Sequence, residues 1–183
     1  NLSGWNGVSA LPPSHDVLKP HIEFATDASS SFGYGGHMGP QYFYGLWPPE
    51  EKTLGHKVIG LMELATVVFA CRVFGPQLAG CRVLLHCDNK ADVDMVTGLS
   101  AKKPKSCFLL RELHTLMVQF GLSLRAVHRP GALNTLADAL SRNDVDTFIR
   151  LAPYLQAFLH CLQVPAATRA CLINALRIKS ARA

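Results

Sequence analysis

Four acidic residues stand at positions that an ordinary structural role explains poorly. Asp27 and Asp88 each close an apolar run, Glu63 is the only charge in a long apolar segment, and Asp138 lies among leucines and alanines. An isolated carboxylate in apolar surroundings is unfavourable unless something compensates its charge. Four of them together would repel one another and retain protons, and a divalent cation removes that penalty. Oxygen ligands favour Mg²⁺ or Mn²⁺ over zinc or copper.

Each candidate also has an ordinary explanation when it is taken alone. Asp27 can form a turn with the serines that follow it, Glu63 can pair with a nearby basic residue, and Asp88 can cap a helix. A lone histidine such as His128 is more often a satisfied strand-end residue than a ligand. Only the combined order and spacing of these residues indicates a common site.

The elements that would position these acids follow from the apolar periodicity. The first three strands are separated by short turns, with Gly39-Pro40 between the last two, and this predicts an antiparallel meander. The order of strands and helices then predicts an α/β fold, with a mixed five-stranded sheet and helices on both faces. Strands are expected within 22–26, 32–38, 41–47, 81–89 and 122–128, and helices within 58–74, 90–99, 106–121 and 134–142.

Two helix ends and the C-terminal segment carry further expectations. Gly75-Pro76 is a common stop signal for the helix over 58–74, and Gly98 is expected to close the helix after Asp88. In the tail, apolar residues from Phe148 to Leu162 fall on one face of a helix, and Pro165 opens another short helix that extends to Ile178. We therefore divide the chain into a lead-in or linker (1–20), a main domain (21–142) and a helical extension (143–183), which either docks on the domain or leads into a neighbouring one.

Composition restricts the class of protein. The 183 residues are 49% hydrophobic and 17% charged, which suits one globular domain. The apolar segment around Glu63 is interrupted and short for a membrane span, and residues 1–16 show no secretory signal. The six cysteines lie in apolar segments without CxxC spacing, so we expect reduced thiols in an intracellular compartment, cytoplasmic or nuclear, rather than disulfides or zinc. The net charge of +5 suits a polyanionic partner but indicates it only weakly.

Four segments, in this order, resemble one known family. TDAS followed by GYGG, then ELATVVFA, CDN and HRPGALNTLADALSR are similar to the ribonuclease H domain attached to reverse transcriptases of LTR-type retroelements. The last motif is especially similar to that of Gypsy-type and DIRS-type elements. The resemblance covers roughly residues 22 to 142 and implies a ribonuclease H-like fold. One departure is Cys87, where the family usually has threonine, beside a ligand rather than at one.

The resemblance implies a metal-dependent endonuclease that hydrolyses the RNA strand of RNA–DNA hybrids. The metal-binding carboxylates of the family fall on Asp27, Glu63, Asp88 and Asp138, and its active-site histidine falls on His128. The implied cofactor is a pair of Mg²⁺ ions, for which Mn²⁺ can substitute. All four carboxylates are present, so the resemblance implies an active enzyme.

Hybrid binding needs contacts to phosphates and to RNA 2′-hydroxyls. The implied partners are the hybrid and an adjoining reverse transcriptase domain, without a membrane. The basic loop around residues 100–105 can equally be a solvated turn. Substrate-binding candidates are Asn89, Lys102, Lys103, Lys105 and Arg129, with Arg142 as a further phosphate contact.

Two other functions remain open at this point. One is a catalytically repurposed ribonuclease H-like module that binds nucleic acid or acts as a scaffold, against which the intact carboxylates argue. The other is a different nuclease of the same superfamily, such as an integrase-like strand-transfer enzyme, which lacks the His-Pro-Gly motif.

Overall fold

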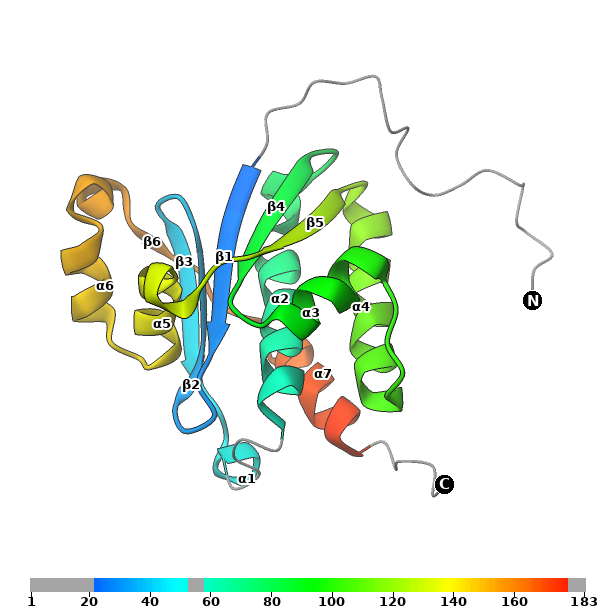
Figure 1. Ribbon diagram of the computed structural model, residues 1–183. Helices are drawn as coiled ribbons and strands as arrows, with labels where there is room; N and C mark the ends of the chain where they lie inside the picture. Colours follow the sequence, from blue (N-terminus) through cyan, green and yellow to red (C-terminus); the bar gives the residue numbers. More distant parts are fainter. Residues whose placement is uncertain (1–21, 53–57, 178–183) are drawn as a thin grey trace.

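The computed structural model describes residues 22–52 and 58–177, so the predicted lead-in (1–20) lies outside the described residues. One mixed sheet forms the centre, with the strand order β5-β4-β1-β2-β3-β6 (Figure 1). The first three strands form the expected antiparallel meander, whereas β4 and β5 run parallel to β1. The strands are β1 (Ile22–Ala28), β2 (Gly33–Met38), β3 (Gln41–Leu46), β4 (Arg82–Cys87), β5 (Ser123–His128) and β6 (His160–Cys161).

Helices cover both faces of this sheet (Figure 1). On one face α2 packs against β1 and β2, and α4 and α7 pack against α2. On the other face α5 packs against the meander and is followed by α6. The helices are α1 (Pro49–Lys52), α2 (Ile59–Leu78), α3 (Lys90–Gly98), α4 (Pro104–Phe120), α5 (Thr135–Ser141), α6 (Val145–Leu151) and α7 (Ala166–Arg177), with short 3-10 turns η2 (Gly131–Leu133) and η3 (Pro153–Phe158).

Alternation along β3 shows how one strand serves two cores. The Phe43 side chain is fully buried in the larger core, which includes α2 and α4. Its neighbours Tyr42 and Tyr44 point to the opposite face and pack with Leu140 and Phe148 of α5 and α6. Successive side chains of a strand face opposite sides, so this pattern fixes which face each helix layer covers.

The expected stop at Gly75-Pro76 is wrong, because α2 continues through both residues to Leu78. Gly75 is needed for packing: a Cβ atom there would lie 2.2 Å from the Phe120 ring of α4. Pro76 removes one helical hydrogen bond without ending the helix, which tertiary packing can support. By length and composition the 20-residue helix could cross a membrane, but most of its side chains are packed into the core of the domain.

Two other expectations are corrected. The sheet has six strands rather than five, because His160 and Cys161 pair with the start of β3. The apolar residues from Phe148 to Leu162 do not form one helix, since α6, η3 and β6 divide them. The helix α3 ends at Gly98 as expected, and the next residue, Leu99, takes the left-handed conformation with φ of +46°. The extension docks on the domain, because α7 contacts α2 and α4.

Candidate active site

Two of the predicted acids meet at one edge of the sheet. Asp27 lies near the end of β1, and Asp88 directly follows the adjacent parallel strand β4. Parallel neighbours end at the same edge, so their terminal side chains share one region. Glu63 reaches this region from α2 and Asp138 reaches it from α5. The charge of Asp138 raises the pKa of both Asp27 and Asp88. The charges of Asp27 and Asp88 in turn raise the pKa of Glu63.

Gly35 allows helix α5 to approach Asp27 closely. It lies opposite Asp27 in the β1–β2 pair, and a Cβ atom there would lie 2.4 Å from Leu140 Cβ and 2.9 Å from the Ser141 nitrogen. No other residue fits at this position without displacing the helix. Gly35 of GYGG is therefore required for the close packing of α5 against the sheet beside Asp27.

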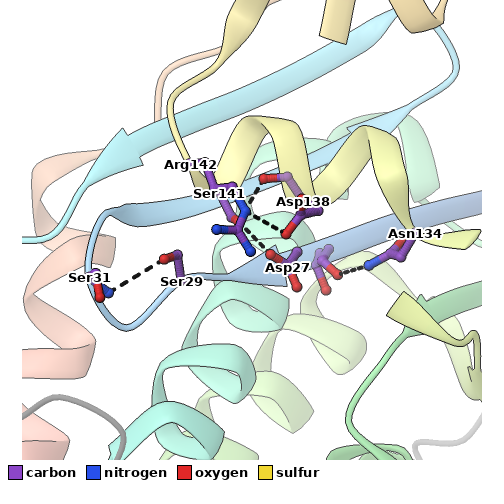
Figure 2. A network of polar contacts seen from close by, with 8 residues as sticks. Asp27, Ser29, Ser31, Asn134, Asp138, Ser141 and Arg142 are labelled. Atoms are coloured by element: carbon purple, nitrogen blue, oxygen red, sulfur yellow. Dashed lines mark hydrogen bonds and ion pairs between the residues drawn. The ribbon is translucent and has the colours of Figure 1, made fainter. Parts of the chain in front are cut away.

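Two residues that the sequence analysis did not single out connect α5 to β1 (Figure 2). The Ser141 hydroxyl donates a hydrogen bond to Oδ2 of Asp27. The buried Asn134 donates from Nδ2 to the Thr26 carbonyl over 3.0 Å. Both lie within the HRPGALNTLADALSR motif. Their polar side chains in a mostly apolar segment are the sequence signal by which they could have been found. These two hydrogen bonds fix the position of α5 relative to β1 and Asp27.

Asp138 is not buried, contrary to the reasoning from its apolar neighbours. Its side chain is 44% exposed and forms an ion pair with Arg142 Nε over 2.8 Å, one helical turn away (Figure 2). The apolar residues around it in the sequence point to the other side of α5, where Ala137, Ala139 and Leu140 are buried. The protein itself therefore compensates the Asp138 charge, and its assignment as a metal ligand stays a prediction.

Asn89 holds Glu63 in place. Its Oδ1 accepts hydrogen bonds from the backbone nitrogens of Ala91 (2.9 Å) and Asp92 (3.4 Å) and so caps α3. This leaves Nδ2 as the donor, and it donates to Oε2 of Glu63. Both groups of the Asn89 amide thus have partners within the protein, and its predicted contact with substrate stays a prediction.

A fifth carboxylate, Asp92, lies beside Glu63 and was missed in the sequence analysis. Its side chain is 1% exposed, and a side-chain hydrogen bond joins its carboxyl group to that of Glu63, which raises the pKa of Asp92 and lowers that of Glu63. In the sequence it stands in KADVDMV, which resembles an ordinary solvated helix. We call Asp27, Glu63, Asp88 and Asp92 the acidic site.

Burial dominates the electrostatics of the acidic site. It raises the pKa of Asp27 to about 6 and that of Glu63 to about 7, and it also raises the pKa of Asp88. Burial and the neighbouring Glu63 raise the pKa of Asp92 to about 9. Among the described residues, no ion pair involves any of the four carboxylates. Desolvation is the largest cause of each shift and neighbouring acids add to it, whereas Arg142 lowers the pKa of Asp27 and His128 lowers that of Asp88 by smaller amounts.

The residues of the acidic site fit a divalent cation by their chemistry. All side-chain donors are oxygens, and Oδ1 of Asp88 is buried without a partner in the described structure. The turn after β5 comes against the same carboxyl group, since a Cβ atom on Gly131 would lie 3.3 Å from Oδ2. In the described part of the chain no three such side chains are close enough to enclose one ion. A cation would therefore have to draw the carboxylates together.

His128 contacts the acidic site directly, whereas the basic candidates have other surroundings. The exposed His128 ring contacts the Asp88 carbonyl through Nε2 at 3.1 Å. Lys102 and Lys103 are exposed before α4, whereas Nζ of Lys105 donates to the Leu176 carbonyl of α7 over 2.9 Å. Lys105 therefore has a structural partner, and the role of all three lysines in substrate binding stays a prediction.

A second group of ionisable residues lies on the α5 face of the sheet, around a cavity of about 220 Å³. His86 and Glu23 form an ion pair over 2.9 Å. Burial, together with smaller effects of the positive charges of Arg129 and His86, lowers the pKa of His37 to about 4. We call this group the imidazole pocket. Its lining comprises Glu23, Phe24, Ala25, His37, Gly39, His86, Arg129, Leu136, Tyr154 and Leu155.

The arrangement of strands and helices matches solved structures, although no family model and no curated protein matches the sequence. Ribonuclease H1 from the halophilic archaeon Halobacterium salinarum aligns with a TM-score of 0.50 at 17% identity, over 69% of this chain and 98% of that one. The fold is ribonuclease H-like. This confirms the predicted α/β fold with its antiparallel meander and parallel strands.

Two further ribonuclease H domains align less closely. The N-terminal domain of a Mycobacterium tuberculosis protein, solved as a fusion with maltose-binding protein, has a TM-score of 0.48 at 19% identity, over 66% of this chain and 95% of that one. A ribonuclease H1 isolated from compost has a TM-score of 0.46 at 18% identity, over 69% and 94%. At such identities the likeness concerns the fold.

Proposed function

We propose that this ribonuclease H-like domain hydrolyses the RNA strand of RNA–DNA hybrids. The observation that carries the proposal is the acidic site, in which Asp27 and Asp88 meet at one sheet edge with Glu63 beside them and no ion-pair partner among the described residues. Such a group is unfavourable on its own and becomes favourable with a divalent cation. The fold and the HRPGALNTLADALSR motif support the choice of substrate.

In this proposal Asp27, Glu63, Asp88 and Asp138 hold two Mg²⁺ ions, and Mn²⁺ can replace them. When bound, the ions would supply a water-derived nucleophile near neutral pH and stabilise the leaving 3′-oxygen. Ser141 and Asn89 orient Asp27 and Glu63 through the hydrogen bonds described above.

In this proposal His128 delivers a proton to the leaving group. It is exposed at the end of β5, and its Nε2 lies beside the backbone of Asp88. An imidazolium group can donate a proton to a departing oxygen. Arg142 pairs with Asp138 and is exposed, so a phosphate could exchange with this ion pair.

We further propose that the domain belongs to a retroelement reverse transcriptase of Gypsy-like or DIRS-like type. This rests on the four motifs in their order and, above all, on the last of them. The adjoining polymerase domain and an intracellular location are parts of the same proposal.

The test is cleavage of a hybrid labelled on its RNA strand, beside duplex DNA and duplex RNA of the same sequence, with Mg²⁺ or EDTA. We expect Mg²⁺-dependent cleavage of the hybrid RNA alone, and none by the Asp27→Asn variant. Binding without cleavage would instead indicate a repurposed module, and cleavage of duplex DNA would indicate another nuclease of this superfamily.

A further inference from the structure

The imidazole pocket is a cavity that two histidines frame across strand β1. His37 of β2 and His86 of β4 both lie opposite Ala25, so the three side chains point to the same face of the sheet. Because Ala25 has a small side chain, it leaves space between the two imidazole rings, where all three residues line the cavity of about 220 Å³. Leu136 of α5 and Leu155 of η3 add an apolar wall.

Arg129 brings a permanent positive charge to this cavity. Its partly buried side chain lines the cavity, and its charge acts on His37, which places the guanidinium group close to that ring. The acid of the pocket, Glu23, is already paired with His86 over 2.9 Å. Among the described residues, the Arg129 side chain has neither an ion pair nor a hydrogen bond. A partly buried cation without a counter-charge is unfavourable, and an anion in the cavity would compensate it.

His37 supplies a hydrogen-bond donor to the same cavity from β2. Its Nδ1 is buried without a partner in the described part of the chain, and burial keeps the ring neutral by lowering its pKa to about 4. A neutral imidazole has one donor nitrogen and one acceptor nitrogen. Since Nδ1 is closed off, Nε2 is the nitrogen that can face the cavity. A bound anion would select the tautomer that carries its proton on Nε2.

The rim of the cavity adds an aromatic surface. Tyr154 of η3 lines the cavity and is nevertheless 72% exposed. A guanidinium group matches phosphate oxygens with two parallel N–H donors, and aromatic side chains stack on nucleobases. Arg129 and Tyr154 together therefore suit a ligand that carries both a phosphate and a planar ring.

We infer that the imidazole pocket binds the phosphate group of a nucleotide unit, with Arg129 and Nε2 of His37 as donors and Tyr154 stacked on the base. The unit is a free nucleotide or part of a nucleic-acid strand, since the phosphate chemistry is the same in both. The inference goes beyond the proposed function, because this site needs neither a metal ion nor the acidic site. Glu23 remains paired with His86 and is not a contact of the ligand.

The test is calorimetric titration of the full chain in EDTA with inorganic phosphate, adenosine 5′-monophosphate and a single-stranded oligonucleotide. Arg129→Gln removes the charge at the cavity. Arg125→Gln is the matched control, because Arg125 is an exposed arginine of β5 that does not line the cavity. We expect Arg129→Gln to weaken binding of the nucleotide by at least about tenfold, and Arg125→Gln by less than about twofold.

Two comparisons resolve the parts of the ligand and its source. Tyr154→Ala should weaken binding of the nucleotide by about fivefold or more and leave the affinity for inorganic phosphate unchanged, because only the base stacks on the ring. Tighter Arg129-dependent binding of the nucleotide than of the oligonucleotide would support a free ligand, and the reverse order would support a strand.

Equal nucleotide affinities of Arg129→Gln and Arg125→Gln, or a parent chain that binds none of the three probes, would overturn the inference. If Arg129→Gln does not fold, Arg129→Lys serves as the second variant, because it keeps the charge, loses the paired donors and should still weaken binding. Asp27→Asn should bind the nucleotide like the parent, and a loss of binding there would place the ligand at the acidic site and refute the inference. A parent that binds the nucleotide through Arg129 but cleaves no hybrid would refute the proposed function alone.

Discussion

The acidic site and the imidazole pocket share strands β1 and β4 but treat charge in opposite ways. In the imidazole pocket the carboxylate of Glu23 has His86 as its partner, and His37 is held neutral by burial. In the acidic site the carboxylates have no ion-pair partner among the described residues, and burial raises the pKa of each. Among the described residues, the first region has an internal ion pair and the second has none. This difference, rather than the number of acids, is the reason that we propose the acidic site as the functional region.

The largest expected effect tests this contrast through catalysis. Asp27→Asn or Asp88→Asn should reduce hybrid cleavage to background, because each removes a ligand, and should raise the melting temperature in EDTA by relieving repulsion. Glu23→Gln, in the imidazole pocket, is the control and should leave the cleavage rate unchanged. Cleavage assays and thermal unfolding in EDTA measure both effects. Parent-like cleavage by Asp27→Asn would show that the acidic site is not catalytic.

Substitutions of His128 and of Asp138 should impair hybrid cleavage in different ways. His128→Ala should slow turnover by about 10²-fold, the lower end for a proton-transfer group, without changing the Mg²⁺ midpoint of activity. Asp138→Asn should shift that midpoint upward and be partly rescued by Mn²⁺, which tolerates imperfect geometry better than Mg²⁺. Titration of activity against each metal distinguishes them. Because Arg142 pairs with Asp138, Arg142→Gln should not shift the midpoint upward; a shift as large as that of Asp138→Asn would assign the effect to the ion pair.

The two regions should also respond oppositely to pH in metal-free buffer. The pKa of Asp27 is raised to about 6, so the folded state holds more protons than the unfolded state between about pH 4 and 6, and stability falls as pH rises through that range. The pKa of His37 is lowered to about 4, so the unfolded state holds more protons between about pH 4 and 6.5, and stability rises with pH there.

The two contributions oppose each other in the parent, so each is measured as a difference in unfolding free energy between parent and variant. From pH 4.5 to 7.5 in EDTA, the stability of the parent relative to Asp27→Asn should fall by about 2 kcal/mol, and relative to His37→Gln it should rise by about 2 kcal/mol. Urea unfolding at both pH values measures this. If the two stability differences changed with pH in the same direction, the contrast between the two regions would be contradicted.

The smallest expected effect concerns the basic residues before α4. The double variant Lys102→Ala/Lys103→Ala should bind all hybrid sequences more weakly, and the slope of log affinity against log salt should fall by about 0.9 for each phosphate that a lysine no longer neutralises. Lys105→Ala should instead lower stability by about 1 kcal/mol, since it removes the hydrogen bond to Leu176. An unchanged salt slope in the double variant would mean that the loop is merely solvated.

The parts of the fold that the sequence predicted well are those set by local patterns. The meander with its Gly39 turn, the amphipathic α4 and the short helix after Asn134 are all present. Errors arose where tertiary packing decides. The Phe120 ring against Gly75 supports α2 beyond an apparent stop, and β3 captures His160 and Cys161, which an apolar helical spacing had included in a helix.

The site shows the same limit. Local patterns and the resemblance indicated Asp27, Glu63 and Asp88, which the fold brings together. They could not indicate that Asp138 is exposed on its helix, or that Asp92 is buried, because both depend on which face of a helix meets its neighbour. In KADVDMV, Asp92 and Asp94 look equivalent, and only the approach of α3 to Gly60 separates them.

The hydrogen bonds that join α5 to β1 also set when the site can exist during synthesis. Asp27 and its partner Ser141 are 114 residues apart, and Asn134 and Thr26 are 108 residues apart. At about 5–20 residues per second, a ribosome needs roughly 6–23 s to travel from one partner to the other. For that time the nascent chain carries Asp27 without the helix that orients it. The geometry around Asp27 is therefore complete only after α5 has emerged.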